Sequence, residues 1–282
     1  MFVKGLVISP SLFYGIILVF LSDMVKEYLN VSLIQSDISH EDVESNYNNY
    51  ETLLKGVAQN TDVIVFPEMF ACGFSDDIVQ HGEQYYQQSI DFLCKTSKDH
   101  HADIVASLPV KENECLYNRL VWIRGNEIIA TYHKRHLFFG CEKQFCTRGE
   151  RKTIVNAEGW NILPLICYDV RFPIWCRNKF ENETMLYDCL LLTANFPSPR
   201  AETLKSLLIA RAIENQAYVI GLNRIGNDGY NNPHSGNSMI VNPLGEIIAE
   251  APLDTQYVLN AKIEWGLLNK LRTYFPVYED WD

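Results

Sequence analysis

The sequence has few basic residues relative to its acidic ones. Its 282 residues include 24 lysines and arginines against 35 aspartates and glutamates, which gives a formal net charge of -11. A surface of this sign repels phosphate backbones, so we expect no nucleic acid among the partners. A small anionic ligand stays possible, because a local basic site can oppose the overall charge.

The sequence also lacks a disulfide framework, internal repeats and low-complexity segments. Its 8 cysteines are irregularly spaced over a long chain, whereas disulfide frameworks belong to short secreted chains. We therefore expect reduced thiols and a cytoplasmic protein. The one close pair, Cys141 and Cys146, lies near His133 and His136 but has no C-x-x-C partner, so we expect no metal site.

A long apolar run occurs once, near the beginning of the chain. Residues 5–22 are almost uncharged, but only Lys4 precedes them, no clear A-x-A cleavage site follows and Pro10 interrupts them. Three interpretations stay open: a signal or anchor, an additional packed element, or a working chain that starts at the second methionine. We expect contact with a membrane only if this run is an anchor, and we treat residues 1–23 as an extension before a single domain, 24–282.

The rest of the chain alternates short β-rich runs with amphipathic ones. The run at 62–68 is continuously apolar, as in a strand buried on both faces, and the run at 40–59 carries its apolar residues on one helical stripe. This alternation predicts an α/β fold with mixed sheets and helices outside. The predicted strands cover 31–37, 62–68, 102–110, 159–167, 187–195, 217–224 and 256–262; hairpins cover 117–134 and 237–251; helices cover 40–59, 83–101, 172–179, 199–216 and 264–272.

Three polar residues each close a predicted strand: Glu68, Lys134 and Cys167. In mixed α/β sheets, functional groups gather at the carboxyl ends of strands. Together the three form a set for acyl transfer. A carboxylate in apolar surroundings can act as base, a thiol activated by that base can attack a carbonyl, and an ammonium can stabilise the resulting oxyanion.

Each of these residues also has an ordinary structural explanation: a capping glutamate, a surface lysine and a core cysteine. The coincidence of all three at strand ends favours catalysis. A binding module without activity stays open as an alternative from another class, although its expected signature is a disrupted set and the set here is intact.

Three blocks of sequence carry a resemblance to a known family: "FPEMFACGF" (66–74), "YHKRHLF" (132–138) and "CYDVRFP" (167–173). In this order and spacing they resemble the signature blocks of the nitrilase, or carbon–nitrogen hydrolase, superfamily. The resemblance covers about residues 30–275. It implies an α-β-β-α sandwich and a homodimer assembled through the face that carries the C-terminal elements, with no cofactor.

The resemblance also implies a role for each residue of the set. Glu68 is expected to be the general base, Lys134 the stabiliser of the oxyanion and Cys167 the nucleophile. A second glutamate between the lysine and the cysteine is expected to orient the lysine and the substrate. Glu142 matches it loosely, and Glu150 is a competitor.

Within the superfamily the chain is most similar to bacterial omega-amidases, in segments such as "CYDVRFPIWCRN" and "ANFPSPR". Their substrates are the omega-amides 2-oxoglutaramate and 2-oxosuccinamate, which they hydrolyse to a 2-oxo acid and ammonia. Two other branches, N-carbamoyl amino acid amidases and deaminated-glutathione amidases, stay open, and a true nitrilase is a weaker alternative.

Such a small-molecule substrate carries a carboxylate, so its pocket needs a cation or several N–H donors. Arg171 and Arg200 are the candidate cations, and a structural pairing of Arg171 is favoured at least as strongly as substrate binding. Tyr168 offers a backbone N–H next to the nucleophile, and Phe196 is a candidate pocket wall. Another charged pair, Arg211 and Glu214, has i, i+3 spacing on a predicted helix, which suits a structural ion pair.

Overall fold

The computed structural model describes residues 25–74, 76–139, 141–181 and 183–281. The interpretations of residues 1–23 lie outside the described residues. No helix within these ranges is long and apolar enough to cross a membrane.

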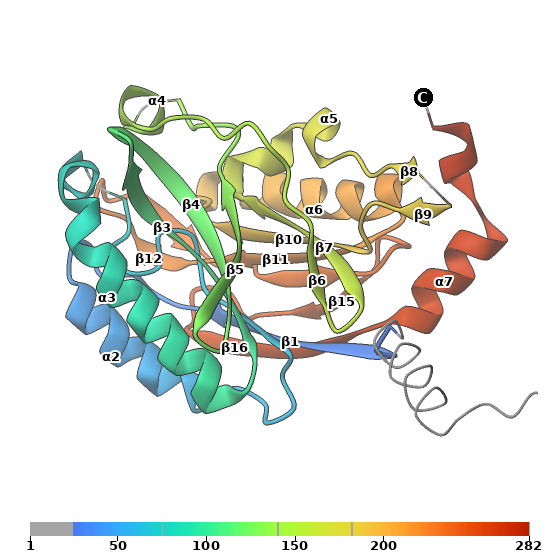
Figure 1. Ribbon diagram of the computed structural model, residues 1–282, viewed down its shortest axis with the longest axis horizontal. Helices are drawn as coiled ribbons and strands as arrows, with labels where there is room; N and C mark the ends of the chain where they lie inside the picture. Colours follow the sequence, from blue (N-terminus) through green and yellow to red (C-terminus); the bar gives the residue numbers. More distant parts are fainter. Residues whose placement is uncertain (1–24, 75, 140, 182, 282) are drawn as a thin grey trace, which may run out of the picture.

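Two six-stranded mixed sheets form the centre of the molecule (Figure 1). The first has the strand order β16-β1-β2-β3-β4-β5 and the second has the order β15-β14-β11-β10-β7-β6. The strands of the first sheet are β1 (Tyr28–Gln35), β2 (Val63–Val65), β3 (Asp103–Glu112), β4 (Cys115–Arg124), β5 (Glu127–His133) and β16 (Tyr257–Glu264). Those of the second are β6 (Val155–Ala157), β7 (Trp160–Ile166), β10 (Cys189–Ala194), β11 (Tyr218–Asn223), β14 (Met239–Val241) and β15 (Ile247–Glu250).

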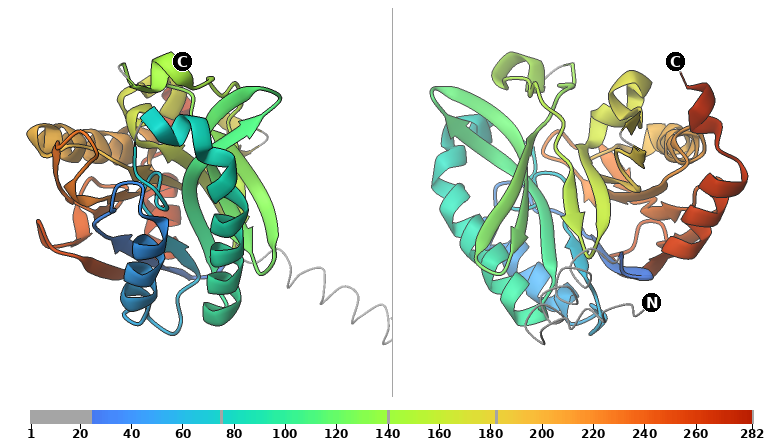
Figure 2. Two further views of the ribbon diagram at one scale, coloured as in Figure 1. Left: turned by 90° about the vertical axis from the view of Figure 1, so that its left-hand side faces the viewer. Right: turned by 45° about the vertical axis from the view of Figure 1, so that its right-hand side comes forward.

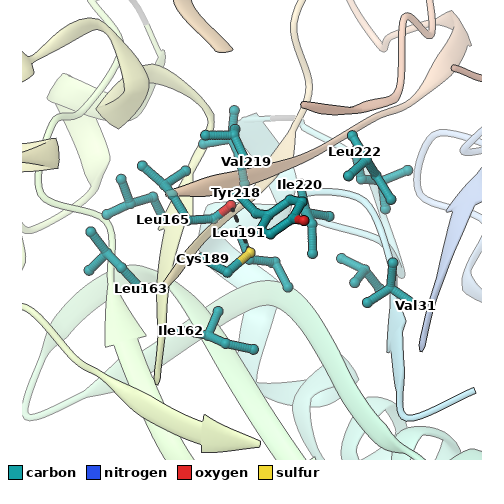
Figure 3. Close-up of a cluster of buried hydrophobic side chains, with 14 of the residues drawn as sticks. Val31, Ile162, Leu163, Leu165, Cys189, Leu191, Tyr218, Val219, Ile220 and Leu222 are labelled. Carbon is teal, nitrogen blue, oxygen red and sulfur yellow. Dashed lines mark hydrogen bonds between the residues drawn. The ribbon is translucent and has the colours of Figure 1, made fainter. Parts of the chain in front are cut away.

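The inner strands are buried because both of their faces are covered. Every residue of β2, β10 and β11 is buried, and for β2 the continuous apolar run at 62–68 predicted this. One core cluster joins the two sheets, with Val31 and Val63 of the first beside Leu163 and Leu190 of the second. Figure 3 shows part of this cluster. The two sheets therefore pack face to face.

Helices cover the outer faces. On the first sheet, α2 (Val43–Leu54) and α3 (Asp76–His100) enclose a second apolar cluster with residues of β2 and β3. On the second sheet, α6 (Ala201–Asn215) buries Leu204 and Leu208. Figure 2 shows these helical layers on opposite sides of the sheets. The predicted α-β-β-α sandwich is confirmed, and α7 (Trp265–Tyr274) follows the last strand as expected.

The predicted helix at 172–179 is wrong in its extent. A 3-10 turn, η1 (Cys167–Arg171), comes first, and α5 spans only Pro173–Cys176 because Arg177 is extended. The predicted helix at 199–216 is confirmed as α6, preceded by a second 3-10 turn, η2 (Ser198–Arg200). Several short elements were not predicted: α4 (Cys141–Phe145), β8 (Phe180–Glu181), β9 (Thr184–Met185), β12 (Ile225–Asn227), β13 (Pro233–Ser235) and η3 (Val277–Asp280).

Candidate active site

Four strands end in polar residues that come together between the two sheets. Lys134, Cys167 and Asn195 directly follow β5, β7 and β10, and Glu68 lies in the turn after β2. Strands β2 and β5 run in the same direction in the first sheet, and β7 and β10 are parallel in the second. The backbone N–H of Asn195 donates to Glu68 Oε2 at 2.9 Å, which joins the two sheets at this edge.

A closed ring of hydrogen bonds surrounds Lys134. Its Nζ donates to Glu68 Oε1 at 2.8 Å and to Glu142 Oε2 at 2.7 Å. The side-chain amide of Asn118 donates to Oε1 of both carboxylates, at 2.8 and 2.9 Å. The residue exposures are 0% for Glu68, 1% for Lys134 and Asn118, and 2% for Glu142, so the ring is shielded from solvent.

Burial and charge act against each other in this ring. Burial raises the pKa of Glu68 above its usual range, and the ammonium of Lys134 opposes that rise. For Lys134, burial acts to lower the pKa, but the carboxylates of Glu142 and Glu68 raise it well above its ordinary value. The lysine is therefore a fixed cation at the bottom of the site.

Cys167 stands in an uncommon backbone conformation. It is the first residue of η1, and its φ of 43° lies in the left-handed region, which costs a non-glycine residue about 1–2 kcal/mol. The buried carboxylate of Asp169 holds this turn, because its Oδ2 accepts the N–H of Ile166 and the hydroxyl of Tyr132. Its Oδ1 accepts the N–H of His136. The turn aims the thiol at the end of β7 toward the ring.

The thiol is protonated at neutral pH. Burial, together with the Glu68 carboxylate, raises the pKa of Cys167 well above its ordinary value, and the ammonium of Lys134 opposes the rise. Glu68 and the backbone N–H of Asn195 both act on the pKa of Cys167, and the thiol and Glu68 line the same pocket. A thiolate can form only if a base takes the proton, and Glu68 is in position to do so.

A pocket of about 360 Å³ opens above the ring and the thiol. Two arginines, Arg171 and Arg200, line it together with Lys134 and three carboxylates, Glu68, Glu142 and Asp228. The β12–β13 hairpin supplies one wall through Asp228, Asn232 and His234. The remaining lining is largely apolar and includes Phe74, Phe138, Phe139, Phe196, Pro197 and Pro199. The pocket thus combines a largely apolar lining with two arginines that can bind a small anionic ligand.

The four residues expected to bind substrate, Tyr168, Arg171, Phe196 and Arg200, all line this pocket. The guanidinium carbons of Arg171 and Arg200 lie 5.6 and 5.8 Å from the centroid of the Phe196 ring. Both arginines therefore flank one aromatic wall, where a carboxylate could meet either of them.

The two candidates for the second glutamate, Glu142 and Glu150, lie in different places. Glu142 belongs to the ring around Lys134 and lines the pocket. Glu150 is exposed and lines a different hollow beside β5.

The remaining charged and metal-ligating candidates have other partners. Arg211 pairs with Glu214 at 2.9 Å, as predicted, and its Nε donates to Val170 O within η1. His133 accepts from Arg119 Nε, and His136 Nδ1 bonds to Asp169. Among the described side chains, no group of three or more His, Cys, Asp or Glu is arranged to hold a metal ion.

Three residues of the site were missed by the sequence reasoning. Asn195 closes the predicted strand 187–195, as Glu68, Lys134 and Cys167 close theirs, so the signal was available. Asn118 stands in the buried register of β4, between Leu116 and Leu120, where a polar residue is unusual. His234 had no signal, because only the folded hairpin brings it to the pocket.

Comparison with known proteins identifies the class. The family model for carbon-nitrogen hydrolases matches residues 30–273, and the chain belongs to this family of enzymes, which includes amide-cleaving hydrolases. Two relatives are the omega-amidase YafV of Yersinia enterocolitica, 37% identical over 255 residues, and the 2-oxoglutaramate amidase of Bacillus subtilis, 32% identical over 254 residues. These alignments cover 90% and 89% of this chain and 97% and 96% of the relatives.

A solved structure agrees with both the family and the fold. A CN-hydrolase superfamily protein of Xanthomonas campestris, with an arsenic adduct in its active site, superposes with a TM-score of 0.87 at 33% identity. The match covers 91% of this chain and 98% of that protein.

Proposed function

We propose that this protein is an omega-amidase that hydrolyses omega-amides of 2-oxo dicarboxylic acids, such as 2-oxoglutaramate and 2-oxosuccinamate. The observation that carries the proposal is one pocket lined by the Cys167 thiol, by the Glu68 carboxylate with the Lys134 ammonium 2.8 Å away, and by two arginines. The relatives named omega-amidase and 2-oxoglutaramate amidase support the choice of substrate.

The first half of the reaction makes a thioester. Glu68 takes the thiol proton as the sulfur of Cys167 bonds to the amide carbon, and the carbonyl π electrons move to oxygen. Lys134 and the backbone N–H of Tyr168 stabilise this oxyanion. Glu68 then gives its proton to the amide nitrogen, the carbon–nitrogen bond breaks and ammonia leaves.

The second half consumes water. Glu68 takes a proton from water as the hydroxide oxygen bonds to the thioester carbon, and the same donors hold the second oxyanion. When this adduct collapses, the carbon–sulfur bond breaks and the thiolate recovers its proton from Glu68. The products are the 2-oxo acid and ammonia, and the enzyme returns to its starting state.

Glu142 has a supporting role in this scheme. It accepts from Lys134 and from the backbone N–H of Phe138 at 2.8 Å, so it fixes the ammonium relative to the chain. Arg171 and Arg200 bind the substrate carboxylate. A catalytically idle module is disfavoured because every member of the set is present.

We also propose that the protein is a cytoplasmic homodimer. Cytoplasmic conditions suit a chain with 8 cysteines at irregular spacing and a reactive thiol. The dimer face would include the C-terminal elements, where Tyr274 and Phe275 are 87% and 59% exposed. Light scattering should give twice the chain mass, and a monomer at micromolar concentration would overturn the assignment.

One assay tests the function. Ammonia release is measured with 2-oxoglutaramate, 2-oxosuccinamate, an N-carbamoyl amino acid and a simple nitrile, for the wild type and for Cys167→Ala. We expect turnover of the two 2-oxo amides by the wild type alone. Preference for the carbamoyl compound or the nitrile would refute the substrate class, and activity of Cys167→Ala would refute the mechanism.

A further inference from the structure

We propose that Asn118 is a positioning residue of the active site, which fixes the two carboxylates around Lys134 and keeps Glu68 ionised as a base. The inference deepens the proposed function, because it assumes that Glu68 takes the proton of Cys167. Asn118 acts through the carboxylates and not on the substrate, since it does not line the pocket.

The geometry of Asn118 is that of a bridge. Its Nδ2 lies 2.8 Å from Glu68 Oε1 and 2.9 Å from Glu142 Oε1. Lys134 bridges the same two carboxylates from another direction. Glu68 therefore accepts from Lys134 and Asn118 on Oε1 and from Asn195 N on Oε2, which leaves its carboxylate little freedom to turn.

The charge of the ring explains why a neutral donor is useful there. Two carboxylates and one ammonium are buried together, so a single cation serves two anions. N–H groups that donate to a carboxylate favour its ionised form. Asn118 supplies two such N–H groups without another charge, and it thereby opposes the burial that raises the pKa of Glu68.

The orientation of the Asn118 amide satisfies the two carboxylates but not its own oxygen. Its Oδ1 is buried and has no hydrogen-bond partner in the described part of the chain. The opposite orientation would place that oxygen against the two carboxylates, where it would be repelled. The orientation of the Asn118 amide therefore follows from its two bonds to carboxylates, because the packing of β4 alone gives no reason to leave the amide oxygen unpaired.

The position in the strand supports the same conclusion. Along β4, Leu116, Leu120 and Trp122 share the buried register with Asn118. An apolar side chain is the usual occupant of such a register. The backbone carbonyl of Asn118 accepts the N–H of Lys134 at 3.0 Å, so any residue at 118 would keep the strand ends in register.

The test compares Asn118→Leu, which keeps the volume without donors, with Asn118→Asp, which exchanges the amide for a third carboxyl group. Asn178→Leu is the matched control. Asn178 is also 1% exposed and its amide donates to Tyr187 O and Asn215 O, away from the pocket. For each variant, kcat, KM and the pH profile of kcat/KM are measured with 2-oxoglutaramate.

Both Asn118 variants should lower kcat at pH 7 by about tenfold or more, with KM changed by less than about twofold. The acid limb of kcat/KM should move up by about one pH unit, because an unsupported Glu68 holds its proton more tightly. Asn178→Leu should keep the wild-type profile. A purely structural role would reduce activity without moving the acid limb of kcat/KM. If either Asn118 variant folds and shows that result, the proposal is overturned.

A second readout does not depend on the substrate. The rate of alkylation of Cys167 by iodoacetamide is followed against pH by peptide mass spectrometry. The Asn118 variants should show the same upward displacement of the acid limb. If this displacement is seen while the wild type hydrolyses no 2-oxo amide, the function fails and the role of Asn118 stands. If the wild type is active and its alkylation profile matches that of Asn118→Leu, the role fails alone.

Discussion

Replacing Lys134 with methionine would remove the cation that bridges Glu68 and Glu142 while keeping a side chain of similar length. Each carboxylate loses its partner at under 3 Å and stays buried, at 2% exposure or less. Removing one partner of a buried ion pair costs about 3–5 kcal/mol, because an uncompensated charge is left behind. We expect a loss of this order in the free energy of unfolding at pH 7.

The loss should depend on pH with a predictable sign. Without the ammonium, the effect of burial on Glu68 has less opposition, and the pKa of Glu68 in the folded variant rises further above the unfolded value of about 4.3. The folded variant then binds more protons than the unfolded chain. Its stability therefore falls as the pH rises from about 4.3 through the folded pKa. The deficit against the wild type should be larger at pH 8 than at pH 5.

The activity of Lys134→Met should fall by more than its loss of stability explains. The loss of one oxyanion donor typically lowers kcat by about 10²–10³-fold, and protonation of Glu68 removes the base as well. The double variant Lys134→Met/Glu142→Gln separates the two effects. It carries one buried carboxylate fewer and should regain part of the stability, but it should stay as inactive as the single variant.

The assay is urea denaturation at pH 5, 7 and 8, combined with ammonia release. Lys134→Met with wild-type stability at pH 8 would refute the electrostatic reasoning. A double variant that regains activity along with stability would refute the role of the lysine in the oxyanion site.

Three further predictions follow from other parts of the site. Glu68→Gln should fold but lose activity by about 10²–10⁴-fold, and alkylation of Cys167 should slow in parallel; fast alkylation would assign the base elsewhere. Arg171→Met and Arg200→Met should each raise KM for 2-oxoglutaramate with a smaller effect on a neutral amide of similar size, and equal effects on both substrates would mark that arginine as structural. Gly226→Ala should destabilise the β12–β13 hairpin by about 1–2 kcal/mol in thermal unfolding, because φ is +79° and a Cβ would lie 2.2 Å from Asp37 Oδ1; unchanged stability would show that the hairpin shifts freely.

The strands were the most predictable part of the fold. The apolar runs at 62–68 and 187–195 contain strands that are fully buried, and short continuous apolar runs of this kind are typical of inner strands. The helix after Cys167 was less predictable. A 3-10 turn precedes it, and Asp169 of that turn binds Tyr132 of β5 and His136 of the loop that follows, which lie more than thirty residues earlier in the sequence.

The amino-acid sequence by itself determined the alternating architecture, the family and the three strand-end residues Glu68, Lys134 and Cys167, because burial patterns and signature blocks are local. Tertiary structure determined the contacts between residues far apart in the sequence, which no local pattern predicts. It placed Glu142 and not Glu150 beside Lys134, added Asn118 to the ring and the N–H of Asn195 to Glu68, and brought the hairpin with His234 to the pocket. The physical reason is that a buried charge is stable only beside groups that pair with it. Here these groups come from strands that meet only when the two sheets pack.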